Sequence, residues 1–343
     1  MQVMEKNKSS IERDLLIIAL SSLNFLSAEE KLLVYNSTDT LEMLSKMSIS
    51  DFESIIQRHI SQKWNGDTVL KRTLISRKIL SLFNIKYATM FSEEYPENLR
   101  NIPDLPFVLF YRGNISILNN KCVSVIGTRA VTPDGKQAAF DFGKNAANDG
   151  WTVVGGLSEG VEYFAHLGAL KAESGKTVAL LPCGIDTIVP SANKMLAASI
   201  IKKGCIVSEY QPGVPVGHWS YAQRNRLLAG VASDVVLVQA PTGSGSLTTA
   251  NLTEEYNREL YIMKTAFSPK AIEVNGIKKN MMSKKDNKKE DEKKKKKMKN
   301  ICNFVLDDGI PVIDDYVDFI KCKDEKPGSR FYDVSEFEQS FAM

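Results

Sequence analysis

The sequence has few of the residues that mark metal-binding, disulfide-rich or membrane proteins. Its 343 residues include five scattered cysteines, which form no CxxC pair, and three histidines. The paired ligand spacing of a zinc site is therefore missing, and an odd number of isolated thiols suits a reducing compartment. The apolar run at 15–28 is too short to span a bilayer, and the polar start shows no signal-peptide pattern. We expect a cytoplasmic protein without a metal, a cofactor or a membrane segment.

Three widespread functional motifs are missing as well. No GxGxxG follows the first strand-like run, no GxxxxGK[ST] occurs, and there is no HExxH pair. These absences argue against a dinucleotide-binding fingerprint, a P-loop ATPase and a zinc protease. Because no nucleophile or general base stands out, we expect a binding protein and not an enzyme.

Positive charge is concentrated in one segment. The formal net charge is +3, but residues 264–300 hold 14 lysines and only 5 acidic residues. The rest of the chain, with 30 basic and 36 acidic residues, is slightly acidic. If the folded part binds a polyanion, it must therefore do so through a local patch.

The hydrophobic pattern predicts an α/β protein with a helical domain in front. Residues 1–88 show helical spacing, and 89–120 has the prolines of a linker followed by an edge strand. From residue 121, near-continuous Val/Ile/Leu runs alternate with helical segments, which is typical of parallel strands buried on both faces. We predict an extended Rossmann-like, doubly wound, mostly parallel sheet. Its expected strands are 122–127, 151–157, 177–184, 205–210, 234–240 and 259–263.

Two further segments are expected to stand apart from this fold. The predicted Rossmann-like domain comprises 121–264 and 301–322, and the Lys-rich stretch 265–300 between them is too polar to bury a core. We interpret it as a solvated, disordered insertion, with an electrostatic tether for nucleic acid as the alternative. Residues 323–343 are expected to form a tail.

Three loops that follow predicted strands carry residues suited to phosphate. Strand-end loops before helices meet at one edge of a parallel sheet, where helix N-termini attract anions. Arg129 adds a cation with bidentate reach, and the alternative for it is a surface salt bridge. For His166 alone, a hydrogen-bonded core histidine is the simpler interpretation. The candidate residues in these loops are Gly127, Thr128, Arg129, Gly156, Gly160, His166, Ser244, Gly245, Ser246 and Thr248.

A fourth cluster combines cations with aromatic rings. Arg224, Asn225 and Arg226 follow Tyr221 by a few residues. Guanidinium groups beside rings suit a single strand, because phosphates pair with arginine while bases stack on the rings. A helix start with solvated charges is the competing interpretation.

Six segments, in order, resemble motifs of the DNA processing protein A (Smf) family. Together they cover much of the chain between Tyr95 and Met263. The segments are GTR at 127–129, GGLSEGVEYFAH ending at His166, CGIDTIVPSAN at 183–193, SEYQPG at 208–213, RNRLLAG from Arg224 and SGSLTTA from Ser244.

This resemblance implies a function in DNA processing. It implies that the chain binds single-stranded DNA, protects incoming DNA and assists loading of the RecA recombinase in natural transformation, as a homodimer. Two positions depart from the family pattern, because Glu159 and Glu162 replace its frequent Arg and Asp. We expect Lys194, Arg129 and the Arg224–Arg226 pair to compensate for the added negative charge.

Two other functions compete with DNA binding. The same broad fold includes lysine-decarboxylase-like phosphoribohydrolases, whose PGGxGTxxE signature falls on residues 241–249. The glutamate that such a hydrolase needs is replaced by Thr249, which cannot act as a general acid or base. The other alternative is a nucleotide-sensing module that does not bind DNA.

Overall fold

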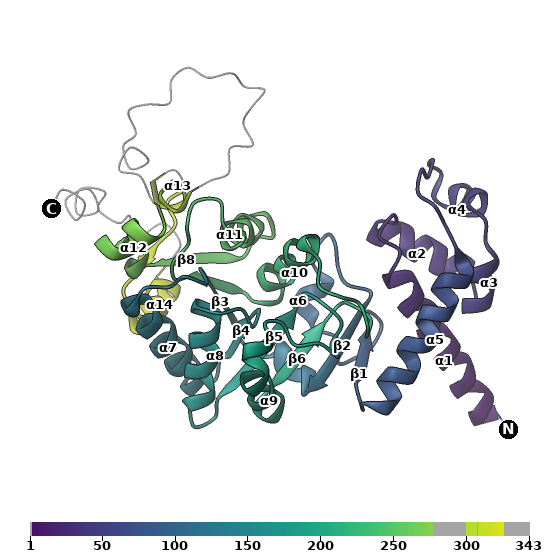
Figure 1. Ribbon diagram of the computed structural model, residues 1–343, viewed down its shortest axis with the longest axis horizontal. Coiled ribbons are helices and arrows are strands. Elements are labelled where there is room, and N and C mark those ends of the chain that lie inside the picture. Colours follow the sequence, from purple (N-terminus) through teal and green to yellow (C-terminus); the bar gives the residue numbers. More distant parts are fainter. Residues whose placement is uncertain (1, 277–299, 307, 326–343) are drawn as a thin grey trace, which may run out of the picture.

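The computed structural model describes residues 2–276, 300–306 and 308–325 (Figure 1). Residues 277–299 of the predicted insertion (265–300) and residues 326–343 of the predicted tail (323–343) therefore lie outside the described residues. Within the described ranges, no helix is both long enough and apolar enough to cross a membrane.

A bundle of helices forms a lobe of its own at the start of the chain, on the right in Figure 1. Its core includes the fully buried Leu16 and Phe52, and the Phe52 ring packs edge-on against Trp64 at 4.9 Å. Polar caps define the helix starts. Ser27, for example, exchanges side-chain and backbone hydrogen bonds with Glu30. The helices are α1 (Gln2–Ser21), α2 (Ala28–Ser37), α3 (Leu41–Lys46), α4 (Ile49–Ile56) and α5 (Gly66–Leu82).

The remaining described chain builds a nine-stranded sheet, which confirms the predicted doubly wound, mostly parallel architecture. Seven neighbouring strands run parallel, and the two strands at one edge pair antiparallel. The pattern did not predict the first and last strands, because both are short. Across the sheet the order is β1 (Lys86–Thr89), β2 (Val108–Gly113), β6 (Cys205–Ser208), β5 (Lys176–Leu181), β4 (Thr152–Gly155), β3 (Cys122–Ile126), β7 (Asp234–Leu237), β8 (Glu259–Met263) and β9 (Val312–Ile313).

Helices cover both faces of the sheet, so the central strands are buried on each side. This explains why those strands read as continuous apolar runs and not as alternating patterns. One face carries α7 (Pro133–Asn148), α8 (Val161–Lys171), α9 (Lys194–Lys203) and α14 (Tyr316–Asp324); the other carries α6 (Glu97–Arg100), α10 (His218–Val231), α11 (Gly245–Glu255), α12 (Pro269–Val274) and α13 (Ile301–Leu306).

The segment expected to be a linker packs closely on the second face. Tyr95 is 1% exposed, and its hydroxyl donates to the Pro106 carbonyl at 2.6 Å. Leu99 of α6 is fully buried, and the Asn98 side chain donates to the Val231 carbonyl at the end of α10. This strap therefore belongs to the core of the sheet domain.

The prediction of disorder from residue 265 was wrong for its first part. Residues Lys264–Phe267 form a 3-10 turn, which is followed by α12. Ala266 and Ala271 are fully buried, and Ser268 caps α12. The Lys-rich composition of the longer segment concealed this short apolar stretch.

The first lobe packs on the antiparallel edge of the sheet. Ile17, Ile18 and Leu80 share one apolar cluster with Phe107 and Phe110. Polar contacts fix the orientation, because the Gln211 amide donates to the Ile18 carbonyl at 2.8 Å and accepts from Ser76 at 3.1 Å.

Helix α14 continues slightly beyond the predicted domain end and closes an aromatic cluster. Phe319 is fully buried and contacts the rings of Phe142, Trp151 and Tyr261 at 4.9–5.6 Å. Lys323 pairs with the buried Asp234 at 2.5 Å. These contacts attach the last described helix to the sheet.

Replacing Phe319 with Ala should therefore destabilise the protein by about 3–5 kcal/mol, because it opens a cavity among aromatic rings. Urea unfolding followed by circular dichroism measures this change. Val317→Ala on the same helix is the matched control, since Val317 is 57% exposed, and it should change the free energy of unfolding by less than about 0.5 kcal/mol. Equal effects of the two substitutions would contradict the packing of α14.

Candidate nucleic-acid interface

A pocket of about 470 Å³ opens at the carboxyl ends of β3 and β7. The chain progresses from β3 toward β6 in one direction and from β7 toward β9 in the other, so the winding reverses between these two strands. Open α/β sheets bind ligands in the crevice at such a reversal. We call this cavity the switch-point pocket; its walls come from the loop after β3, the loop before α8, α10 and the start of α11.

The loop after β3 is held rigidly in place. Thr128 donates its N–H to the Gln239 carbonyl at 2.7 Å, and its own carbonyl accepts from Val161 N–H at 3.1 Å. Gly160 has φ +78°, and a β-carbon there would lie 2.3 Å from the Thr128 oxygen. Only glycine therefore allows the two loops to approach this closely.

Arg224 forms the floor of the switch-point pocket. Its guanidinium lies across Gly156, where a β-carbon would be 1.2 Å from Nη1. Nη1 donates to the Leu180 carbonyl at 3.2 Å and lies 3.9 Å from a Glu162 oxygen. Arg224 is only 4% exposed, and burial lowers its pKa while Glu162 opposes that change. The site thus has a buried cation with one carboxylate partner.

Glu162 is held in place by Ser158. One of its oxygens accepts from the backbone N–H of Ser158 at 2.9 Å and also from the Ser158 hydroxyl. The pattern Gly156–Gly160 has the GxSxG form, but this hydroxyl is bound to a carboxylate and not to an imidazole. The arrangement lacks the nucleophile–base pair of a hydrolase elbow.

Arg129 supplies an exposed cation at the pocket mouth. Its guanidinium lies 5.3 Å from the ring centre of the half-buried Tyr221, which is a cation–π contact. Within the described part of the chain, no carboxylate pairs with Arg129. The charge is therefore available to an anionic ligand, and the Tyr221 ring lies beside it.

The start of α11 forms the opposite wall. The backbone there is held by Asn225, whose side-chain amide donates to the Gly245 carbonyl at 3.1 Å. No side chain caps the first turn, and among the described residues the buried Ser244 hydroxyl has no partner. Uncapped N–H groups and the positive end of the helix dipole suit an anion.

The structure brings together most, but not all, of the predicted site residues. Gly156 and Gly160 form the support beneath the pocket, while Ser158, Glu162 and Thr249, which the sequence did not single out as ligands, also line it. Thr249 could have been predicted from the sequence, because it follows Ser246 by three residues on α11 and therefore lies on the same face of that helix. The predicted residues that line the pocket are Gly127, Thr128, Arg129, Tyr221, Arg224, Asn225, Ser244, Gly245 and Ser246.

Four predicted residues lie elsewhere. Thr248 is exposed on α11 but faces away from the pocket lining, and Lys194 is exposed at the start of α9. Arg226 pairs with Asp104 at 2.9 Å and Glu209 at 2.6 Å, on the other side of α10. His166 is fully buried beneath Gly155. Helix geometry explains why Arg226 lies on the other side, because a side chain two residues after Arg224 points about 200° further around the helix axis.

The position of Thr249 bears on the hydrolase alternative. Its side chain lines the pocket where the hydrolase signature requires a glutamate, and its hydroxyl donates to the Gly245 carbonyl at 3.3 Å. In the described part of the chain, no group of three or more His, Cys, Asp or Glu side chains is arranged to hold a metal ion. Nothing in this geometry favours base release.

Comparison with known proteins identifies the family of this chain. The sequence profile of the DNA recombination-mediator protein A family matches residues 86–292. This chain belongs to that family. The match spans the sheet domain from β1 to β8, including every loop of the switch-point pocket.

Curated family members align over different shares of their length. Protein Smf from Borreliella burgdorferi is 27% identical over 73% of this chain and 79% of the relative. DNA processing protein DprA from Streptococcus pneumoniae is 35% identical over 49% of this chain and 58% of the relative. Protein Smf from Synechocystis is 32% identical over 56% of this chain and 49% of the relative. The chain thus spans only about half the length of some relatives that it matches.

Two solved structures from the family share this fold. DNA processing protein A from Streptococcus pneumoniae has a TM-score of 0.66 at 23% identity, covering 90% of this chain and 96% of the other. DNA processing protein A from Helicobacter pylori, studied for its single-stranded DNA binding mode, has a TM-score of 0.55 at 26% identity. That alignment covers 69% of this chain and 95% of the other.

His166, a residue of the family motif, is buried in the core and forms a hydrogen bond with Thr177. Thr177 donates its hydroxyl proton to the Val153 carbonyl at 2.7 Å, so it accepts from His166 Nδ1. Nε2 is then the unprotonated nitrogen, and within the described residues it has no hydrogen-bond partner. Burial, reinforced by Arg224 and opposed by Glu162, lowers the pKa of His166 to about 4.

This low pKa predicts a loss of stability in acid. An unfolded histidine titrates near pH 6.5, so between pH 6.5 and 4 the unfolded chain binds a proton that the folded chain does not. Stability should fall by about 2 kcal/mol between pH 7 and 5 through this group. Urea unfolding at both pH values should show a smaller loss for His166→Asn, whose amide can still donate to Thr177. Identical losses in the two proteins would rule out this role of His166.

Proposed function

We propose that the chain binds single-stranded DNA in the switch-point pocket. The observation that carries this proposal is the convergence of Arg129, Tyr221 and the uncapped start of α11 on one cavity. The cation and the helix N-terminus suit a phosphate, and the ring next to them suits a base.

The size and depth of the pocket favour a single strand over a duplex. A cavity of about 470 Å³ admits one or two nucleotides, whose bases must be unstacked to reach Tyr221. The buried Arg224 beneath this surface raises the positive potential of the floor, partly offset by Glu162. Recognition through phosphate and stacking is tolerant of sequence, which suits a protein that handles DNA of any origin.

The wider function that we propose follows from family membership. We propose that the chain protects incoming single-stranded DNA in the cytoplasm, and assists loading of the RecA recombinase during natural transformation and recombination, as a homodimer. Support comes from the match to the recombination-mediator family and from the Helicobacter pylori relative studied for its single-stranded DNA binding mode.

Arg129→Ala should weaken oligo(dT) binding at least about tenfold, because it removes a charge-assisted contact to phosphate. The plot of log K against log salt should also become less steep by about 0.7, the slope of one phosphate contact on a single strand. Fluorescence anisotropy at several salt concentrations measures both effects.

The matched control is Arg112→Ala, an exposed arginine on strand β2 outside the pocket lining, which should bind as the unmodified protein does. Removing residues 277–299 should have a smaller effect than Arg129→Ala. If that removal abolishes binding while Arg129→Ala leaves it unchanged, the Lys-rich segment and not the pocket is the binding site.

A further inference from the structure

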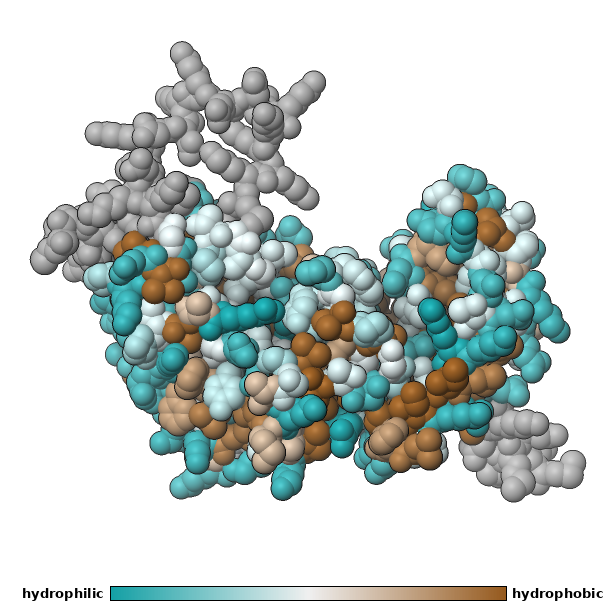
Figure 2. Space-filling view, viewed as in Figure 1, coloured by the Kyte–Doolittle hydropathy of each residue, from teal (hydrophilic) through white to brown (hydrophobic). Residues whose placement is uncertain are grey.

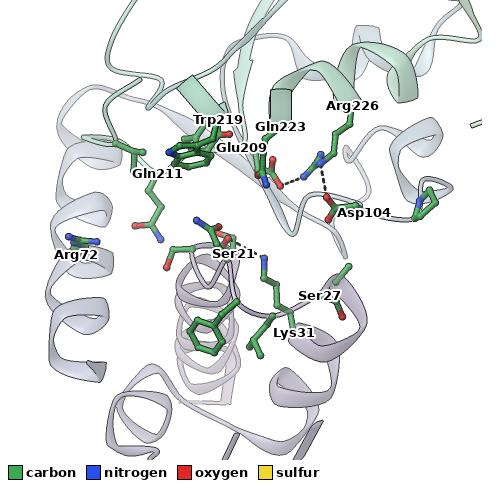
Figure 3. Close-up of a pocket in the computed structure, with 18 residues that line it drawn as sticks. Ser21, Ser27, Lys31, Arg72, Asp104, Glu209, Gln211, Trp219, Gln223 and Arg226 are labelled. Atoms are coloured by element: carbon green, nitrogen blue, oxygen red, sulfur yellow. Dashed lines mark hydrogen bonds and ion pairs between the residues drawn. The ribbon is translucent and has the colours of Figure 1, made fainter. Parts of the chain in front are cut away.

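A second cavity, of about 510 Å³, lies between the helical lobe and the sheet domain (Figure 3). The space-filling view shows a hollow between the two lobes (Figure 2). Its walls come from the α1–α2 connection, α2 and α5 on one side, and from the loop after β6 and α10 on the other. We call it the interdomain pocket.

Helix α10 separates the two pockets. Trp219, Gln223 and Arg226 line the interdomain pocket, whereas Tyr221, Arg224 and Asn225 line the switch-point pocket. Successive side chains of an α-helix are rotated by about 100° around its axis, so each set of three lies on one face and the two faces are opposite. The pockets are therefore neighbours that share one helical wall.

Two cations in the interdomain pocket form no close ion pair among the described residues. Arg226 is neutralised by Asp104 and Glu209, as the dashed lines in Figure 3 show. Lys31 and Arg72 form no such ion pair in the described chain. Burial lowers the pKa of the half-buried Lys31, while the charges of Glu209 and Asp104 oppose this change. A bound phosphate would stabilise the charged form of Lys31 further.

An exposed indole lies in the same pocket. Trp219 is 49% exposed, and its ring packs edge-on against Tyr210 at 5.7 Å, which leaves a face open. Figure 3 shows the Trp219 ring above the cavity, with Lys31 below it and Arg72 to one side. An open aromatic face with cations around it is the combination that single-stranded nucleic acid uses.

We propose that the DNA strand held in the switch-point pocket crosses the start of α10 and continues into the interdomain pocket, where a base stacks on Trp219 and backbone phosphates pair with Lys31 and Arg72. This inference rests on the proposed function. A helix with its side chains is about 10–12 Å across, and stacked nucleotides rise about 3.4 Å each, so roughly three to four nucleotides span the wall. The helical lobe thereby becomes part of the DNA-binding surface.

Tryptophan fluorescence tests the stacked base directly. Titration with oligo(dT) of about 15 nucleotides should quench part of the emission, because a base covers the Trp219 indole. Trp219→Phe should lose this quenching. Trp151→Phe is the matched control, since Trp151 is 5% exposed under the aromatic cluster, and it should retain the quenching. Quenching that persists in Trp219→Phe would overturn the proposal.

Affinity and salt dependence supply a second, independent test. Trp219→Ala should weaken binding about tenfold, the loss of one stacked base. Lys31→Gln combined with Arg72→Gln should lower the salt slope by about 1.4, for two phosphate contacts. Lys71→Gln combined with Lys78→Gln, two exposed lysines on α5 outside the pocket lining, is the charge-matched control and should leave the slope unchanged.

The two proposals fail in different ways. If the unmodified protein binds oligo(dT) and Arg129→Ala weakens this binding, but the Trp219 and Lys31/Arg72 variants bind normally, the interdomain extension is wrong and the switch-point site stands. If the unmodified protein binds no oligo(dT), both the proposed function and its extension are wrong.

Discussion

The site depends on a single buried guanidinium. Arg224 lies under the switch-point pocket, supported by the Leu180 carbonyl and faced by Glu162. Burying a charge is costly, and one carboxylate at 3.9 Å offsets the cost only in part. An anion above the guanidinium would complete this compensation, so the buried charge favours a phosphate at this place.

Opposite faces of helix α10 make different contacts. The face with Arg224 serves the switch-point pocket, while the opposite face, through Arg226, binds Asp104 of the strap and Glu209 after β6. Arg226 therefore fixes the strap to the sheet domain, and the helix is anchored on this side while its other side lines the switch-point pocket. The contact of Gln211 with Ile18 then fixes the helical lobe beside that anchored wall.

The sequence predicted the sheet and most of the switch-point pocket, because buried strands and their small-residue loops leave local patterns. Arg129 and Ser244 lie in loops that follow strands, so their place at the sheet edge could be inferred from topology alone. Arg226 could not be separated from Arg224 in this way, since its direction depends on where α10 packs. The sequence also could not predict the interdomain pocket. Lys31 and Trp219 are nearly 190 residues apart and line the same pocket only because the two lobes pack together.

The overlap between Gly156 and Arg224 has an evolutionary consequence. Any side chain at 156 would occupy the space of the guanidinium, so Gly156 cannot gain a β-carbon unless Arg224 moves or is replaced by a shorter residue. Among homologous proteins, a β-carbon at the position of Gly156 should therefore covary with a shorter residue at the position of Arg224. A lineage that made both changes would exchange its charged floor for a neutral one, and with it the preference for anionic ligands.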